Sequence, residues 1–260
     1  MDLSPEDRAE LRRAKLILEN PGMAAKLSST LGSPVEMGMK LLPARMQKAV
    51  HEATRAALMK ALDVAVSSMG RGRPKAPSNR MHKIAAAASG AAGGAFGIAA
   101  IGIELPISTT VILRSIADIA AAAGEDPRET ETKLACLLVF ALGSTKDASD
   151  DAAESGYFAA RSALATAVTE ASRHLAEKGL SKGTAPALVR LISLIASRFG
   201  VVVSQKAAAQ MVPVLGAAGG ALINTLFISH YQDMARGHFI VRRLERKYGP
   251  QAVREAYSVA

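Results

Sequence analysis

Residues 84–113, IAAAASGAAGGAFGIAAIGIELPISTTVIL, form an almost uncharged stretch in which Glu104 is the one charged residue. As a helix, the charge-free part from Ile84 to Ile103 would be about 30 Å long, close to the hydrocarbon thickness of a bilayer. It consists mainly of Ala and Gly, whereas large apolar side chains drive insertion into lipid. Glycines four residues apart, such as Gly90 and Gly94, allow close helix packing. The stretch therefore predicts either a tightly packed hairpin in the core of a soluble helical protein or a segment that contacts lipid.

A second uncharged run covers residues 207–229, and it repeats at 216–221 the sequence GAAGGA found at 90–95. If this repeat is a duplication, the two hairpins would pack together at the centre of the fold. No segment shows a sustained two-residue alternation of apolar and polar side chains. We therefore expect an all-α protein, a multi-helix bundle around Ala/Gly-rich central helical hairpins.

Capping residues and three- to four-residue apolar spacing place the remaining helices. Ser4-Pro5 begins the first helix, and Ser33-Pro34 begins another by the same pattern. Gly249-Pro250 ends the last long helix. The other predicted helices cover residues 43–69, 106–123, 126–143, 157–177, 188–199 and 214–248.

The net charge of +9 is concentrated at the two ends of the chain. Residues 1–83 carry +7, residues 84–229 carry −1 and residues 230–260 carry +3. An apolar centre with basic flanks suits an anionic surface such as phospholipid headgroups. Nucleic-acid binding is not expected, because aromatic residues make up only 4% of the chain and no zinc module accompanies the basic residues.

The N-terminal sequence and the single cysteine favour a reducing compartment. MDLSPEDRAELRR is charged and lacks the apolar core of a secretory signal. Cys136 is the one cysteine and lies in an apolar run, so we expect a small buried side chain. The predicted location is cytoplasmic, peripheral to or partly inserted in the inner membrane.

The segment directly before the apolar stretch is basic and rich in Gly and Pro. Residues 70–80, GRGRPKAPSNR, predict a linker. Basic residues beside an apolar segment attract anionic lipid by roughly 1 kcal/mol each. A solvated loop is the alternative. The candidate headgroup-binding residues are Arg71, Arg73, Lys75, Arg80 and Lys83.

Glu104 is the first candidate for chemistry. A carboxylate among apolar neighbours is costly unless it is paired, and buried acids are often functional. The structural alternative is an acid that bonds to the backbone at a helix start or pairs with Arg114, Arg236 or Arg242.

The second candidate comprises His230, Asp233 and His238, with Asn224 earlier on the same predicted helix. On a helix, His238 would be rotated about 80° from His230, so we expect no metal site there. With Glu104 from another helix, these residues would line a hydrolase pocket. The motifs of zinc proteases, serine hydrolases and Walker A nucleotide-binding proteins are absent from the sequence, and no cofactor is expected.

Several short motifs, taken together and in order, resemble the EcsC family over about residues 40–250. They are ELPISTT (104–110), LRSIA (113–117), GED (124–126), LACL (134–137), FALG (140–143), PVLG (213–216), ARGHF (235–239) and RRLE (242–245). The resemblance implies a bacterial protein tied to membrane processes, since the founding member is encoded beside an ABC transporter in an operon linked to secretion. Some relatives carry peptidase or hydrolase labels, and the resemblance assigns no chemistry. The family-pattern positions are Glu104, Pro106, Arg114, Gly143, Pro213, Gly216, Asn224, Ala235, Phe239 and Arg242.

The resemblance and the charge pattern together divide the chain into three parts. Residues 1–40 form an N-terminal helical arm, residues 41–250 an EcsC-like helical domain, and residues 251–260 a C-terminal tail. We expect a non-enzymatic protein that binds an anionic membrane lipid or acyl chain, or an ABC transporter or other membrane protein. A hydrolase and a soluble carrier of a lipid or acyl chain are the alternatives. The predicted structural polar anchor comprises Glu104, Arg114, Asn224 and Arg242.

Overall fold

The computed structural model describes residues 3–19, 26–27, 29, 43–69, 84, 101–142, 156–179, 185–210 and 216–260. Within these ranges the chain forms eight α-helices and no β-strand, so the predicted all-α bundle is confirmed. The helices are α1 (Pro5–Leu18), α4 (Ala44–Ser68), α6 (Ile101–Ala122), α7 (Thr130–Leu142), α8 (Gly156–Lys178), α9 (Pro186–Gln210), α10 (Gly216–Tyr248) and α11 (Pro250–Ser258).

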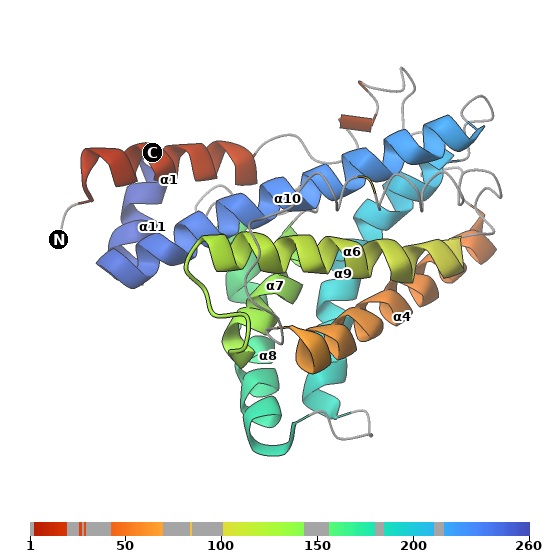
Figure 1. Cartoon of the computed structure of the whole chain (residues 1–260), viewed down its shortest axis with the longest axis horizontal. Coiled ribbons are helices and arrows are strands. Elements are labelled where there is room, and N and C mark those ends of the chain that lie inside the picture. The colour runs from red at the N-terminus through yellow and green to blue at the C-terminus, as the bar shows by residue number, and fades with distance from the viewer. Residues whose placement is uncertain are drawn as a thin grey trace.

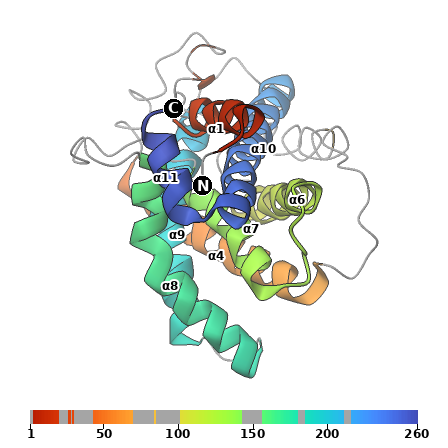
Figure 2. The same ribbon diagram turned by 90° about the vertical axis from the view of Figure 1, so that its left-hand side faces the viewer.

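Helix α10 runs along most of the molecule, and the other helices pack on it or on its neighbours (Figure 1). Helices α1 and α11 lie against its C-terminal half (Figures 1 and 2). The N-terminal ends of α4 and α6 lie at the other end of the molecule. Helices α8 and α9 pack side by side.

Local sequence accounts for several helix ends. The Ser4 side chain caps α1 by accepting a hydrogen bond from the Asp7 backbone N–H at 3.2 Å, and Pro5 occupies the first turn. Gly249 ends α10 with a φ of 86°, a left-handed conformation that glycine adopts without strain. Pro250 then begins α11. These predicted boundaries are confirmed.

The predicted start of a helix at Pro106 is wrong, because α6 already includes Ile101 and Pro106 lies inside it. Proline removes one N–H donor and presses on the carbonyl four residues earlier, here that of Gly102. Pro106 is the sixth residue of the described helix, so these losses fall close to its N-terminal end. The helix extends N-terminal to the proline and carries Glu104 on its first turn.

The C-terminal ten residues, predicted as a tail, form α11 and the end of the chain. Val253 and Tyr257 of α11 are buried in a small core with α1 and α10. At Gly237 of α10, an added Cβ would lie 2.7 Å from Cγ of Leu18, so the glycine lets α1 pack closely.

The main core contains a cluster of aromatic rings from α7, α9 and α10. Phe199 lies 4.9 Å from Phe140, 6.0 Å from Phe227 and 5.6 Å from Tyr231, measured between ring centroids. All four side chains are fully buried. Cys136 is also buried, as predicted, and burial raises the pKa of its thiol.

Some sequence predictions fall outside the described residues. They include residues 85–100 of the first Ala/Gly-rich hairpin, the helix start at Ser33, the basic linker, Gly143 and Pro213. The division of the chain at residue 40 stays a prediction, although α1 packs on α10 and α11.

Candidate functional site

A buried ion pair joins α6 and α9, two long and apolar helices of the described chain. Glu104 of α6 accepts a hydrogen bond from Nζ of Lys206 of α9, with 2.6 Å between Nζ and Oε1. Nε2 of Gln210 donates to the other carboxylate oxygen at 3.2 Å. The Lys206 ammonium also lies 4.8 Å from the centre of the Phe227 ring. Lys206 is 0% exposed and Glu104 is 5% exposed, so both charges depend on these contacts.

The expected pairing of Glu104 with Arg114, Arg236 or Arg242 is therefore wrong. Burial raises the pKa of the Glu104 carboxyl, but attraction and hydrogen bonding from Lys206 outweigh burial and leave the pKa below its ordinary value. Burial lowers the pKa of Lys206 against the opposing effect of Glu104. Because the carboxyl stays ionised, the contact is a salt bridge at neutral pH.

The structure brings together only part of the predicted polar anchor. A side-chain hydrogen bond from Asn224 of α10 also stabilises the Glu104 carboxylate. Arg114 instead donates to the Ser68 hydroxyl at 3.3 Å, joining α6 to the end of α4. Arg242 lies about five turns further along α10 than Asn224, about 27 Å by helix rise.

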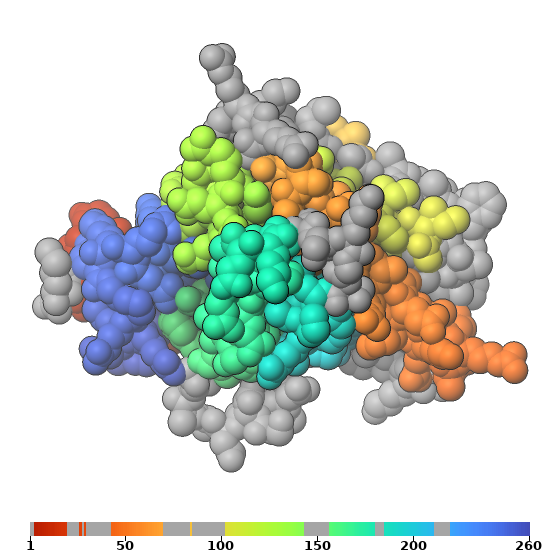
Figure 3. Space-filling view, turned by 90° about the horizontal axis from the view of Figure 1, so that it is seen from below, coloured from red at the N-terminus to blue at the C-terminus, as the bar shows by residue number. Residues whose placement is uncertain are grey.

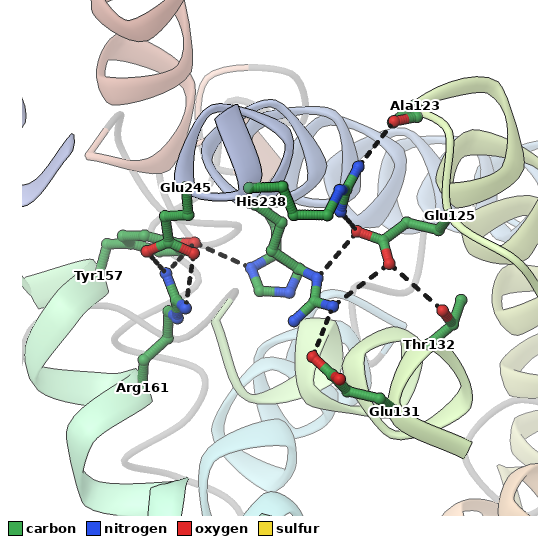
Figure 4. Close-up of polar contacts among 10 residues, drawn as sticks. Ala123, Glu125, Glu131, Thr132, Tyr157, Arg161, His238 and Glu245 are labelled. Carbon is green, nitrogen blue, oxygen red and sulfur yellow. Dashed lines mark hydrogen bonds and ion pairs between the residues drawn. The ribbon is translucent and has the colours of Figure 1, made fainter. Parts of the chain in front are cut away.

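Arg242 belongs to a second polar network, at the C-terminal end of α10 (Figure 4). Its Nε and Nη2 atoms donate to Glu125 at 3.0 and 3.2 Å, and Nη2 also donates to Glu131 at 3.0 Å. Glu125 additionally contacts Arg246 and accepts from the Thr132 hydroxyl. Burial raises the pKa of the Glu125 carboxyl, but the two arginines outweigh it and lower that pKa. The network connects the turn between α6 and α7 to α10.

His238 lies between this network and a third ion pair (Figure 4). Arg161 of α8 makes a two-pronged contact with Glu245 of α10, at 2.8 and 3.0 Å, and donates to the Tyr157 hydroxyl at 3.2 Å. The Tyr157 oxygen is 2.9 Å from Nδ1 of His238. Because the Arg161 guanidinium can only donate, Nδ1 is the one acceptor that the described residues offer the Tyr157 hydroxyl. We therefore assign the hydroxyl proton to the bond with Nδ1, which places the imidazole proton on Nε2.

These residues border a pocket of about 570 Å³ between α7, α8, α10 and α11. On this face α8 lies beside the C-terminal helices (Figure 3). One wall of the pocket is apolar, and the other wall, mainly from α10, is polar. The lining includes Ala135, Leu138, Phe158, Ala165 and Val168 on the apolar side, and Arg161, His238, Arg242, Glu245 and Arg254 on the polar side. This pocket is the candidate functional site.

The four residues weighed for catalysis do not converge. Glu104 contacts Asn224, which is fourteen residues before His238 on α10, about 21 Å along the axis. Asp233 pairs with Arg236 at 2.7 Å and with Lys26 at 3.6 Å. His230 packs its ring on Tyr231. In the described part of the chain, no set of three or more His, Cys, Asp or Glu residues is placed to hold a metal ion. The condition for a hydrolase site around Glu104 and the histidines is therefore not met.

Sequence reasoning found His238 and Arg242 but missed most of their partners. Tyr157 lies 81 residues before its partner His238, and Arg161 lies 84 residues before its partner Glu245, so neither gives a local signal. Lys206 had a signal: it is the one charged residue in 199–229, as Glu104 is in 84–113. Two lone opposite charges in two apolar stretches predict a buried pair.

The buried His238 makes stability depend on pH. Burial, followed by the positive charges of Arg161 and Arg242, holds its pKa well below the ordinary value of 6.5. The unfolded chain therefore binds a proton near pH 6.5 that the folded chain does not, so stability is complete above pH 6.5 and falls below it. The expected slope approaches about 1.4 kcal/mol per pH unit.

Urea unfolding between pH 8 and pH 5 measures this slope. The variant His238→Gln should flatten the profile between pH 6.5 and pH 5, where carboxylates remain ionised. An unchanged slope in the variant would contradict the assignment.

Comparison with known proteins supplies the family. No curated protein matches this chain, and no solved structure matches it. The model of the EcsC protein family matches residues 6–244, a range that includes most of α1 and α10, the buried ion pair and most of the pocket. The match begins well before residue 40, so it covers most of the segment predicted as an arm. The chain belongs to the EcsC protein family.

Proposed function

We propose that the protein binds the surface of an anionic membrane through the N-terminal end of α6. The observation that carries the proposal is a pair of isoleucines one turn apart: Ile103 is 76% exposed and Ile107 is 51% exposed. Exposed large apolar side chains next to each other are typical of an interaction surface.

Basic residues accompany this apolar surface. Helix α4 packs along α6, and its first turns carry exposed Arg45 and Lys48 at the same end of the molecule (Figures 1 and 3). Cations beside inserted apolar side chains strengthen binding to anionic headgroups. The overall charge of +9 acts in the same direction.

The length and composition of two helices are compatible with a membrane role. Of the described helices, α6 over Gly102–Ala122 and α9 over Pro186–Gln210 are long and apolar enough to cross a bilayer. About half of each is buried in the fold, and core helices of soluble proteins pass the same test. We therefore propose attachment to the membrane surface by the exposed isoleucines.

Co-sedimentation with vesicles tests the proposal. We expect binding to vesicles with an equal mixture of phosphatidylglycerol and phosphatidylcholine at low salt, and weaker binding in high salt. Because each inserted isoleucine contributes roughly 1.5–3 kcal/mol when fully buried, Ile103→Ser with Ile107→Ser should weaken binding at least about tenfold. Both side chains are exposed, so the fold is retained.

The matched control is Leu16→Ser, which removes a 70% exposed apolar side chain from α1 at the opposite end. It should bind vesicles like the wild type. Equal loss in both variants, or no binding by the wild type at low salt, would refute the proposal. Neutral replacements of the five basic linker residues test whether residues 71–83 add to the attraction.

A further inference from the structure

The pocket beside His238 contains a buried donor that the fold leaves unused. His238 is 0% exposed and lines the pocket, and its Nε2 atom has no hydrogen-bond partner among the described residues. Since the Tyr157 hydroxyl bonds to Nδ1, Nε2 carries a proton available for an acceptor. A buried polar atom without a partner costs free energy, and a ligand oxygen in the pocket would remove that cost.

A second donor lies one turn away on the same face of α10. Arg242 lines the pocket and uses Nε and Nη2 for its bonds to Glu125 and Glu131. Among the described residues, its Nη1 atom has no hydrogen-bond partner. Residues four apart on a helix face the same side, so these two donors converge on one region of the pocket. Two convergent donors, one of them cationic, favour an anionic oxygen.

The charge balance of the lining also favours an anion. Arg161, Arg242 and Arg254 outnumber Glu131 and Glu245 by one. The Glu131 carboxylate that pairs with Arg242 is on a side chain 70% exposed, so a ligand anion can replace it at little cost. A ligand with one negative charge would neutralise the pocket.

The opposite wall accepts an apolar group. Ala135 and Leu138 lie one turn apart on α7, and Phe158, Ala165 and Val168 contribute apolar atoms from α8. Pockets that bind small molecules typically have 300–1,000 Å³ and combine an apolar lining with a few polar anchors. At about 570 Å³, this one is within that range.

We propose that the pocket between α7, α8, α10 and α11 binds an anionic amphiphile, an alkyl chain bearing a single carboxylate or phosphate group. The anionic oxygens accept hydrogen bonds from Nε2 of His238 and Nη1 of Arg242, and the chain packs on the α7–α8 wall. This inference does not depend on membrane attachment, because the pocket is far along α10 from the exposed isoleucines.

Isothermal titration with four soluble probes tests both halves of the ligand. The probes are decanoate, decyl phosphate, decanol and inorganic phosphate. The first two should bind at least about tenfold more tightly than the last two, a difference of about 1.4 kcal/mol. Inorganic phosphate binding as tightly as decyl phosphate would reduce the site to an anion site, and equal binding of decanol would reduce it to an apolar one. Either result overturns the proposal.

Two matched variants locate the binding. Ala165→Trp fills the pocket from an exposed position on α8 and should abolish decyl phosphate binding. Ala163→Trp, on the same helix but outside the lining, should bind like the wild type.

A second pair of variants tests the charge of the pocket. Arg254→Gln should weaken the binding of decanoate and decyl phosphate about tenfold and leave the binding of decanol unchanged. Arg55→Gln on α4 should leave the binding of all the probes unchanged. Binding that survives Ala165→Trp overturns the proposal.

The imidazole of His238 in the wild-type protein reports directly whether the ligand contacts Nε2. In the NMR spectrum of the wild-type protein, the Nε2 resonance of His238, assigned by its loss in His238→Gln, should shift on addition of decyl phosphate. A resonance that stays fixed while decyl phosphate binds would also overturn the proposal. The double variant Ile103→Ser, Ile107→Ser should retain decyl phosphate binding. The pocket proposal and the membrane proposal can therefore be refuted independently of each other.

Discussion

Replacing Lys206 with methionine is expected to destabilise the fold by about 3–5 kcal/mol at neutral pH. The variant Lys206→Met keeps the volume of the side chain but leaves the Glu104 carboxylate buried without its counter-charge. Gln210 and Asn224 remain as hydrogen-bond donors, but neither carries a charge. Urea unfolding followed by circular dichroism measures the loss in the free energy of unfolding. This loss is a large part of the stability of an ordinary domain.

The pH dependence of this variant distinguishes a lost charge pair from lost packing. Without Lys206, burial raises the pKa of Glu104 above that of the unfolded chain. The destabilisation should therefore be greater at pH 8 than at pH 5, because the folded state then favours the protonated acid. Adding Glu104→Gln should restore most of the stability at pH 8.

An exposed pair provides the control. Lys60 and Asp63 lie 3.4 Å apart on α4 with both side chains more than half exposed. Lys60→Met should cost less than about 1 kcal/mol. A loss of similar size for Lys206→Met would show that the buried pair contributes no more than a surface one.

Removing the ring of Phe199 is expected to cost about 3–5 kcal/mol. Phe199 contacts Phe140, Phe227 and Tyr231, and Phe199→Ala would leave a cavity where three helices meet. The rings form tilted and edge-to-face pairs as well as one stacked pair, so the loss exceeds the burial of apolar area alone. Urea unfolding again measures the effect.

Val201→Ala on the same helix is the matched control, because Val201 is 37% exposed. It should cost less than about 1 kcal/mol. A double-mutant cycle with Phe140→Ala should show that the two losses are not additive, since the rings are in direct contact. Additive losses would mean that the aromatic cluster does not act as a unit.

The helices could be predicted because their signals are local. A capping serine and a proline begin α1, and a glycine and a proline end α10, each within a few residues of the boundary. The position of Pro106 inside α6 could not be predicted the same way. That proline has no N–H to donate to the Gly102 carbonyl, so the local pattern marks residue 106 as a helix start even though the preceding turn is also helical.

The candidate site was predicted only in part. His230 and His238 stood out as members of a His/Asp set on one predicted helix, and Arg242 stood out as a position of the family pattern. Which histidine reaches the pocket depends on α8, because Tyr157 bonds to His238 and not to His230. The wall formed by α11 was not predicted, because its position depends on packing against α1 and α10.

Local sequence patterns were enough to predict the all-helical class, several helix boundaries, the basic ends and a lone acid in an apolar segment. They could not show that Lys206, 102 residues further along the chain, neutralises that acid, or that Arg161 meets Glu245 beside His238. Helical periodicity defines which residues share a face, but not which helix covers that face. That choice depends on the packing of all the faces at once, which no local pattern records.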